Sequence, residues 1–200
     1  NDKLIYFLAQ SIDSDTINFA NQNDFNEVDR RITFSLKKSD HISKRKLLKG
    51  LRIDVCTETD INEIGDLAQR TNWHTRYYKD PVFPKTKLKE FYRLWSEKSV
   101  RGNLDNLVIA ARLDGDLAGF ISLKFNGKNS SSIGLITVDS QYKGLKMGDY
   151  LIDFAARYLF KRDFKSVDVV TQFDNGAAKN LYYRNNFKVT NDQLWFHKWQ

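Results

Sequence analysis

Two glycines stand between an apolar strand pattern and an amphipathic helix pattern, an arrangement that suits the binding of a phosphate. The segment reads Gln141-Tyr-Lys-Gly-Leu-Lys-Met-Gly148, and it follows a short apolar run at 133–138. Glycine lets the backbone approach a ligand closely, and the free N–H groups at a helix start attract an anion. The residues after Gly148 show helical spacing at 151, 154, 155, 158 and 159. The sequence therefore predicts a pyrophosphate-bearing ligand at this loop.

Two better-known phosphate loops do not fit these residues. The dinucleotide fingerprint needs three glycines at fixed spacing, whereas only Gly144 and Gly148 are present. A Walker A loop ends in Gly-Lys-Ser or Gly-Lys-Thr, which is absent. Taken alone, the loop is equally compatible with an ordinary turn between a strand and a helix.

The sequence downstream favours the phosphate interpretation. A strand pattern at 166–172 precedes Asn175-Gly-Ala-Ala-Lys-Asn-Leu-Tyr-Tyr-Arg-Asn-Asn-Phe187. Asn175 is a natural N-cap, and one face of the helix that follows carries Ala178, Leu181, Tyr182 and Asn185. Over residues 51–200 this order resembles the GNAT family of acyl-CoA-dependent N-acyltransferases. In that family a Gln/Arg-x-x-Gly-x-Gly/Ala loop holds the coenzyme A pyrophosphate, and an Asn-x-x-Ala-x-x-x-Tyr helix lies beside the thioester.

The resemblance implies acetyl-CoA as co-substrate and assigns roles to particular residues. It makes Tyr182 the catalytic acid that protonates the departing thiolate; a half-buried packing role is the alternative. Tyr183 projects about 100° away around the helix and cannot face the same sulfur. The cofactor-binding residues implied are Leu135, Ile136, Val138, Gln141, Lys143, Gly144, Lys146, Gly148 and Asn175. Lys146 departs from the family pattern, which has glycine there, so a loop that needs a positive φ would bind coenzyme A less well.

The chemistry of acyl transfer sets further expectations. The strand before the loop is splayed in this family, so backbone N–H groups of 135–138 are expected to stabilise the oxyanion. Asn175 could bind the coenzyme or act only as an N-cap. The sequence indicates no general base; of His41, His74 and His197, His74 is the most interesting because of the residues around it. No metal is expected.

Composition limits the class of protein. The 200 residues are 41% hydrophobic and 28% charged, which fits a globular fold rather than a disordered chain. The net charge of +7 favours polyanionic ligands. Nucleic acid is the obvious alternative, but no zinc spacing, RNP-type motif or basic helix-turn-helix pattern supports it. Cys56 is the only cysteine, so no intramolecular disulfide can form. No bilayer-spanning run or signal peptide is evident, and we expect a cytoplasmic protein without membrane insertion.

The fold class expected is α/β (α+β): a mixed, mostly antiparallel sheet flanked by helices, with a small N-terminal appendage. Residues 1–50 are interpreted as a β/α subdomain and connector, and residues 51–200 as the acetyltransferase domain. Helices are expected at 14–23, 60–71, 85–100, from 148 and from 175. Strands are expected at 4–8, 28–36, 51–57, 107–113, 117–125, 133–138, 166–172, 187–190 and 194–199, with 130–132 as a loop.

The acceptor is sought in Trp73-His-Thr-Arg-Tyr-Tyr-Lys-Asp-Pro-Val-Phe83, where aromatic and charged residues share one loop. With the helix around 92–95, this loop resembles the TDP-fucosamine acetyltransferase branch of the family. The resemblance implies that Arg76, Tyr77 and Asp80 line a nucleotide-sugar site. The predicted function is N-acetylation of a nucleotide-linked deoxyamino sugar in polysaccharide biosynthesis. The alternatives are acetylation of a protein or peptide amine, and a non-catalytic acyl-CoA-binding module. A homodimer is left open.

Overall fold

One eight-stranded sheet runs through the molecule, in the order β1-β8-β2-β7-β6-β5-β4-β3. The computed structural model describes residues 3–42 and 46–200. Between these described strands every neighbouring pair is antiparallel except β6 and β7. The strands are β1 Leu4–Gln10, β2 Asn26–Lys37, β3 Leu51–Val55, β4 Leu107–Leu113, β5 Asp116–Asn126, β6 Ser130–Val138, β7 Ser166–Gln172 and β8 Lys188–Trp199. The predicted mixed, mostly antiparallel sheet is confirmed.

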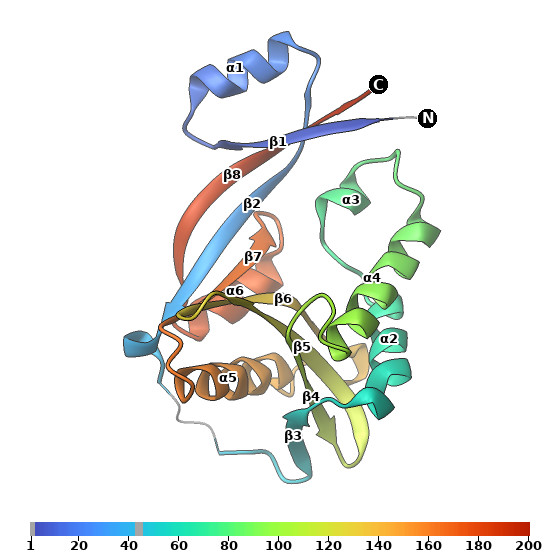
Figure 1. The fold of residues 1–200 in the computed structure, drawn as a ribbon, viewed down its shortest axis with the longest axis vertical. Helices are drawn as coiled ribbons and strands as arrows, with labels where there is room; N and C mark the ends of the chain where they lie inside the picture. The colour runs from blue at the N-terminus through green and yellow to red at the C-terminus, as the bar shows by residue number, and fades with distance from the viewer. Residues whose placement is uncertain (1–2, 43–45) are drawn as a thin grey trace.

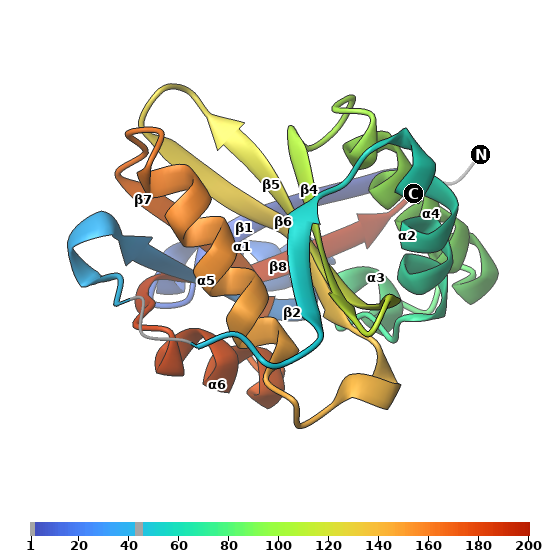
Figure 2. The same ribbon diagram turned by 90° about the horizontal axis from the view of Figure 1, so that it is seen from below.

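Helices cover both faces of this sheet (Figures 1 and 2). They are α1 Ser14–Gln22, α2 Ile61–Arg70, α3 Arg76–Lys79, α4 Lys85–Val100, α5 Met147–Phe160 and α6 Gly176–Arg184. On one face α5 and α6 pack with the central strands into the largest hydrophobic core, which includes Phe34, Leu151 and Tyr182. On the other face α2 and α4 bury Ile64, Leu67 and Tyr92 against β4 and β5.

The N-terminal segment supplies a strand to the middle of the sheet rather than only an appendage. β2 lies between β8 and β7, and Ile32, Phe34 and Leu36 point from it into the main core. Only β1 and α1 form a separate small core, with Phe196 of β8. The division at residue 50 stays a prediction, and the connector residues 43–45 lie outside the described residues.

Two sequence expectations for the strands are wrong. The last two expected strands are one strand of 12 residues, β8. It stays continuous because it pairs with β2 over residues 188–197 and with β1 over residues 193–199, and small register shifts between β2 and β8 absorb its irregularity. Ser130–Ser132, expected as a loop, begins β6 and pairs with β5 on one side and β7 on the other. A serine run lacks an alternating pattern, so its pairing cannot be predicted locally.

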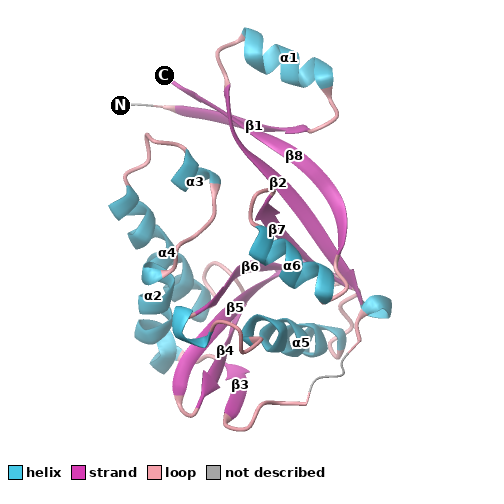
Figure 3. Ribbon diagram, turned by 180° about the vertical axis from the view of Figure 1, so that it is seen from behind, coloured by secondary structure: helices cyan, strands magenta, loops and turns pink. Residues whose placement is uncertain are grey.

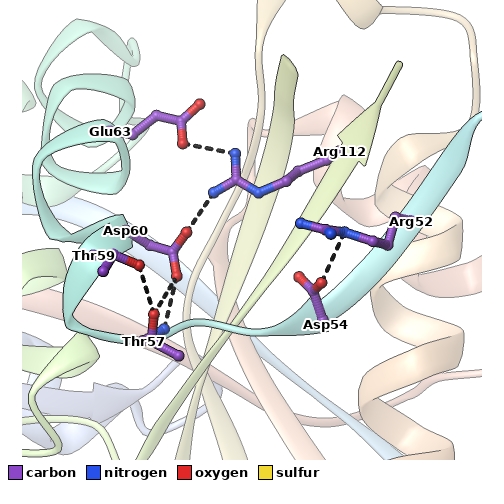
Figure 4. Close-up of polar contacts among 7 residues, drawn as sticks. All are labelled: Arg52, Asp54, Thr57, Thr59, Asp60, Glu63 and Arg112. Atoms are coloured by element: carbon purple, nitrogen blue, oxygen red, sulfur yellow. Dashed lines mark hydrogen bonds and ion pairs between the residues drawn. The ribbon is translucent and has the colours of Figure 1, made fainter. Parts of the chain in front are cut away.

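A buried arginine joins β4 to the start of α2 (Figure 4). Arg112 donates from Nη2 to Asp60 at 2.6 Å and from Nη1 to Glu63 at 2.7 Å. Asp60 also accepts from the Thr57 backbone N–H at 2.7 Å in a capping box. Burial acts to raise the pKa of Asp60, but the bonds from Thr57 and Arg112 hold it below its ordinary value. Nearby on β3, Arg52 pairs with Asp54.

A buried carboxylate sits where the pairing of β5 and β6 shifts register. Asp105, 2% exposed, accepts from Trp95 Nε1 at 3.0 Å and from Ser122 Oγ at 2.5 Å. The hydroxyl of Ser122 in turn accepts from the backbone N–H of Leu135 at 2.8 Å. The register shift lies between Ile121 and Leu123, so Ser122 takes the place of a backbone acceptor for β6. This network therefore anchors β6 to β5 near the point where the pairing of β6 with β7 ends.

Gly134 gives this carboxylate its space, so Gly134→Ala should be strongly destabilising. A Cβ there would lie 2.2 Å from Asp105 Oδ2, which three donors hold in place. We expect the free energy of unfolding, measured in urea, to fall by about 1–3 kcal/mol. Gly176→Ala is the matched control because no heavy atom lies within 4 Å of its Cβ position, and its change should stay within about 0.5 kcal/mol. Equal effects of the two substitutions would contradict this account.

Candidate active site

The central strands separate and leave a cavity of about 860 Å³. β6 pairs with β7 only between Ser130–Ile133 and Ser166–Val169. Beyond Ile133 the two strands are not paired, and residues 133–138 and 169–172 line the cavity from its two sides. Its remaining wall comes from the segment 71–77, from 142–148 and from α6. Figure 3 shows α5 and α6 close together beside this part of the sheet. The splayed strand expected from the sequence is present.

The backbone of β6 offers donors to this opening at alternate residues. The N–H of Leu135 donates to Ser122 Oγ at 2.8 Å, and that of Asp139 donates to the carbonyl of Ala118 at 2.9 Å, both on the β5 side. Successive N–H groups of a strand point in opposite directions. The N–H groups of Ile136 and Val138 therefore point to the side where β7 has departed. Leu135 lines the cavity with its side chain, but its N–H is already engaged.

The loop from Asp139 to Gly148 presents free backbone donors at the start of α5. The N–H groups of Gly144, Lys146, Met147 and Gly148 donate to no acceptor within the described residues. Asp139 anchors the other end of the loop: it accepts from the Gln141 N–H at 3.1 Å and pairs with Arg70 at 2.6 Å. Burial acts to raise the pKa of Asp139, but the bonds from Arg70 and Gln141 hold it below its usual range. The loop is thus fixed as an anion cradle.

Lys146 adopts the left-handed conformation that the sequence argument treated as the unfavourable case. Its φ is +59° and its ψ is +25°, where glycine is the ordinary residue. Gly144, with φ +84°, also lies in this region. The lysine therefore carries backbone strain, and it is one of the residues that line the cavity.

Contact between α5 and α6 explains Gly148 and brings the two predicted motifs together. A Cβ at residue 148 would lie 3.0 Å from Leu181 Cδ2, so the glycine permits close approach of the helices. One residue later, the fully buried Asp149 accepts two bonds from Arg184, each of 2.8 Å. This partnership raises the pKa of Arg184 above its ordinary value. Inside the protein, the guanidinium group of Arg184 takes the place of the water that would otherwise hydrate the Asp149 carboxylate.

α6 carries the predicted catalytic residue and its N-cap. Asn175 accepts from the Ala178 N–H at 3.2 Å, so it does cap the helix, and it also lines the cavity. Tyr182 is 2% exposed and lines the cavity, with its ring packed on Phe34 and Phe187. Burial raises the pKa of its phenol, so the proton stays on the oxygen throughout the neutral range. Tyr183 is 55% exposed and lies outside the cavity lining.

The three residues predicted to bind the acceptor substrate do not lie together. Arg76 and Tyr77, at the start of α3, line the cavity. Asp80 does not, because its carboxylate accepts from His197 Nδ1 at 2.7 Å and from Trp199 Nε1 at 3.0 Å. It ties the end of α3 to β8. Gln141 is likewise outside the lining, on the exposed side of its turn. The other predicted cofactor-binding residues line the same cavity.

The charge of the cavity wall is one-sided. Its cationic residues are Arg76, Lys143, Lys146 and Arg184, and no aspartate or glutamate is among the described residues that line it. His74 is the one imidazole of this lining. The sequence argument missed Trp195 of β8 and Arg184. No local pattern identifies Trp195, because its place in the wall depends on β8 lying beside the opening. Arg184 could have been identified, because it is the last residue of the helix that the sequence already predicted. Such a wall attracts polyanions.

Comparisons with known proteins agree with this geometry. A family model described as the acetyltransferase (GNAT) family matches residues 68–187. The spore coat polysaccharide biosynthesis protein SpsD of Bacillus subtilis is 21% identical over 140 residues, which is 70% of this chain and 48% of that protein. A GCN5-related N-acetyltransferase structure from Sphaerobacter thermophilus has a TM-score of 0.71 at 13% identity, covering 98% of this chain and 60% of its own.

A smaller relative of known structure shares the core. It is the PaiA N-acetyltransferase of Thermoplasma acidophilum in complex with coenzyme A, with a TM-score of 0.56 and 21% identity over 74% of this chain and 98% of its own. This chain spans about half the length of the curated relatives that it matches. In the described ranges no helix is long and apolar enough to cross a membrane, and no cluster of His, Cys, Asp or Glu could hold a metal.

Replacing Lys146 should separate the strain of the loop from its charge. Lys146→Gly and Lys146→Ala both remove the ammonium group, but only glycine relieves the positive φ. We expect the glycine variant to exceed the alanine variant by about 1 kcal/mol in free energy of unfolding. Both should bind coenzyme A more weakly than the wild type, by a similar factor, in calorimetric titration. Equal stability of the two variants would show that the conformation at residue 146 is not strained.

Proposed function

The chain belongs to the acetyltransferase (GNAT) family, and from this premise we propose that it transfers an acetyl group from acetyl-CoA to the amine of a nucleotide-linked deoxyamino sugar. The coenzyme diphosphate would bind the free N–H groups of Gly144, Lys146 and Gly148, with the ammonium groups of Lys143 and Lys146 nearby. This assignment rests on the cradle at the start of α5. A helix N-terminus and flexible lysines both favour a diphosphate.

The reaction requires a bond exchange at the thioester carbon. The neutral amine attacks the carbonyl, a carbon–nitrogen bond forms, and the carbonyl oxygen becomes an oxyanion. Backbone N–H groups of Ile136 and Val138 are the proposed donors to that oxygen, because they point into the opening between β6 and β7. Collapse of the intermediate breaks the carbon–sulfur bond and leaves a thiolate, while the nitrogen loses its extra proton to water.

Tyr182 is the proposed proton donor to the thiolate. It lines the cavity from α6, and its raised pKa keeps it protonated at neutral pH. The same shift makes the phenol a weaker acid than a thiol, whose pKa is about 8.5. Transfer to the sulfur is therefore energetically uphill, and it becomes easiest once the full negative charge has formed there. Tyr182 therefore first donates a hydrogen bond to the leaving sulfur. It transfers its proton only after the carbon–sulfur bond has broken.

The positive charge of the cavity lining is the observation that supports a nucleotide-linked sugar as the acceptor. Three cationic side chains of its lining, Arg76, Lys143 and Lys146, pair with no carboxylate of the described residues, whereas Arg184 is paired with Asp149. The coenzyme diphosphate would balance only part of the charge of these three. An acceptor that itself bears a diphosphate fits this excess. The similarity to a protein named for spore coat polysaccharide biosynthesis supports the same substrate class. A lysine amine of a peptide, with a pKa of about 10.4, would demand a stronger base than this lining offers.

A panel of acceptors tests the proposal. Purified protein is assayed with acetyl-CoA and thiol detection on aminosugar nucleotides, the corresponding free aminosugars and lysine peptides. We expect turnover on at least one sugar nucleotide, with much less on its free sugar. Preference for peptides would favour the protein acetyltransferase alternative. Tight coenzyme A binding without turnover on any amine would favour a non-catalytic module.

Tyr182→Phe should lower kcat by about a hundredfold or more, because it removes the proton donor and keeps the ring. The packing on Phe34 and Phe187 is retained, so the unfolding free energy should change little. Tyr183→Phe is the matched control, since this neighbouring tyrosine lies outside the cavity lining. Unchanged turnover in Tyr182→Phe would remove this residue from the mechanism.

Arg76→Ala should raise KM for the sugar nucleotide by about tenfold or more, because a charge-assisted contact to the phosphate is lost. KM for acetyl-CoA should change by less than about twofold, since Arg76 lies on α3 and away from the α5 cradle. Arg101→Ala, an exposed arginine just after α4, controls for the loss of one positive charge. Equal effects on the two substrates would undo the assignment of the 73–83 segment to the acceptor.

A further inference from the structure

The buried polar atoms that lack hydrogen-bond partners are concentrated where α3 lies against β2 and β8. Within the described residues these atoms are Asp29 Oδ2, Arg31 Nε, Arg76 Nε and His197 Nε2. Two come from β2, one from α3 and one from β8. Buried donors without partners are costly, and a group of them indicates a missing ligand or ordered water. This junction is therefore the place to look for an unassigned binding site.

Two arginines of this group share one aromatic ring. The guanidinium carbon of Arg76 lies 3.4 Å from the centroid of the Trp195 ring, and that of Arg31 lies 5.8 Å from it. The two guanidinium carbons therefore cannot lie farther apart than the sum of these two distances. Among the described residues no carboxylate pairs with either arginine. Burial lowers the pKa of Arg31, and the charge of Arg76 lowers it further, as expected for like charges held close together.

The neighbouring charges are already paired. Lys79 of α3 contacts Asp29 at 2.6 Å and Asp174 at 3.0 Å, and Asp80 holds His197. Arg30, next to Arg31 in β2, pairs with Asp192 at 2.5 Å. The junction therefore holds two half-buried guanidinium groups whose Nε atoms are buried and without partners, and that no carboxylate of the described residues neutralises. Arg76 does contact the rings of Tyr6, Tyr77 and Trp195, which offset part of the cost of its charge. A dianion placed between them would satisfy both orphaned Nε donors and end the repulsion.

The two arginines also connect two cavities. Arg76 lines the main cavity, and Arg31 lines a second one of about 400 Å³. The two cavities share Trp95, Ile133, Gly134, Val169 and Val170 as lining residues. The second cavity also carries Lys124 and Asp168. A carboxylate there suits a hydroxyl group better than another phosphate.

We propose that Arg31 and Arg76, which both lie near the Trp195 ring, form a two-arginine clamp for the phosphate or diphosphate of the acceptor. This inference rests on the proposed function and names the residues that bind the phosphate of its acceptor. The amine side of the acceptor occupies the main cavity. The part beyond the phosphate extends into the second cavity, toward the hydroxyl-binding Asp168. Arg31 thus makes the N-terminal segment part of the binding site.

Inorganic pyrophosphate is the probe for the test, titrated calorimetrically into the full chain with saturating coenzyme A present. Coenzyme A fills the α5 cradle, so a second anion site is measured by itself. Arg31→Met should weaken pyrophosphate binding by about ten- to a hundredfold, the value of one charge-assisted contact. Arg31→Lys keeps the charge without the planar fork and should lose less. Arg30→Met, the same change one residue earlier, is the control and should bind within about twofold of the wild type.

Thermal unfolding separates binding from structure. Without pyrophosphate, Arg31→Met should melt at or above the temperature of the wild type, because a half-buried charge that no carboxylate of the described residues neutralises is removed. Pyrophosphate should raise the melting temperature of the wild type and leave that of the variant unchanged. Lower ligand-free stability of both Arg31→Met and Arg31→Lys would assign Arg31 to the frame of the sheet and overturn the clamp. So would pyrophosphate that only displaces coenzyme A.

The outcomes also distinguish this inference from the proposed function. If a sugar nucleotide is acetylated with unchanged KM in Arg31→Met, the clamp is wrong and the proposed function remains. If pyrophosphate binding depends on Arg31 but no aminosugar nucleotide is acetylated, the clamp stands and the acceptor is another phosphorylated amine.

Discussion

The end of the hydrogen-bonded pairing between β6 and β7 is the constraint on which the rest of the molecule depends. Four residues of each strand pair in parallel, and beyond Ile133 β6 pairs only with β5. A strand that loses its neighbour leaves backbone donors exposed, which is normally a liability that must be covered. Here the exposed edge forms one wall of the main cavity, and a ligand with a carbonyl or amide can take the place of the missing strand. Asp105 and Ser122 hold the other edge of β6 in place, so the opening keeps its width.

Buried carboxylates and cationic residues have different places in this molecule: the carboxylates hold the elements of the fold together, and the cationic residues line the main cavity. The buried carboxylates that hold the frame are paired with donors: Asp149 with Arg184, Asp80 with His197, and Asp105 with Trp95 and Ser122. The cavity wall is the opposite, with cations and no carboxylate in its described lining. The chain satisfies its own buried anions and leaves cations for anionic ligands. Part of the net charge of +7 therefore lies in the cavity wall where the chemistry is proposed.

The N-terminal segment contributes to both the hydrophobic core and the proposed acceptor site through a single strand, β2. Because β2 alternates, Ile32, Phe34 and Leu36 enter the core that supports α5 and α6, while Arg31 faces the junction under α3. A long β8 on its other side brings Trp195 and His197 to the same junction. Removal of this strand would therefore affect the core and the acceptor side together, and the segment cannot be treated as a separable attachment.

Local patterns in the sequence determined the parts of the protein that depend on near neighbours. The glycine loop, the Asn175 N-cap, the boundaries of α4 and the family motifs on α5 and α6 follow from residues within about a dozen positions of each other. Only tertiary structure decided that β2 lies between β7 and β8, that Asp80 is held by His197 rather than free for substrate, and that Arg31 meets Arg76 across Trp195. These contacts join residues far apart in the chain, and their cost or benefit depends on burial, which no local pattern records.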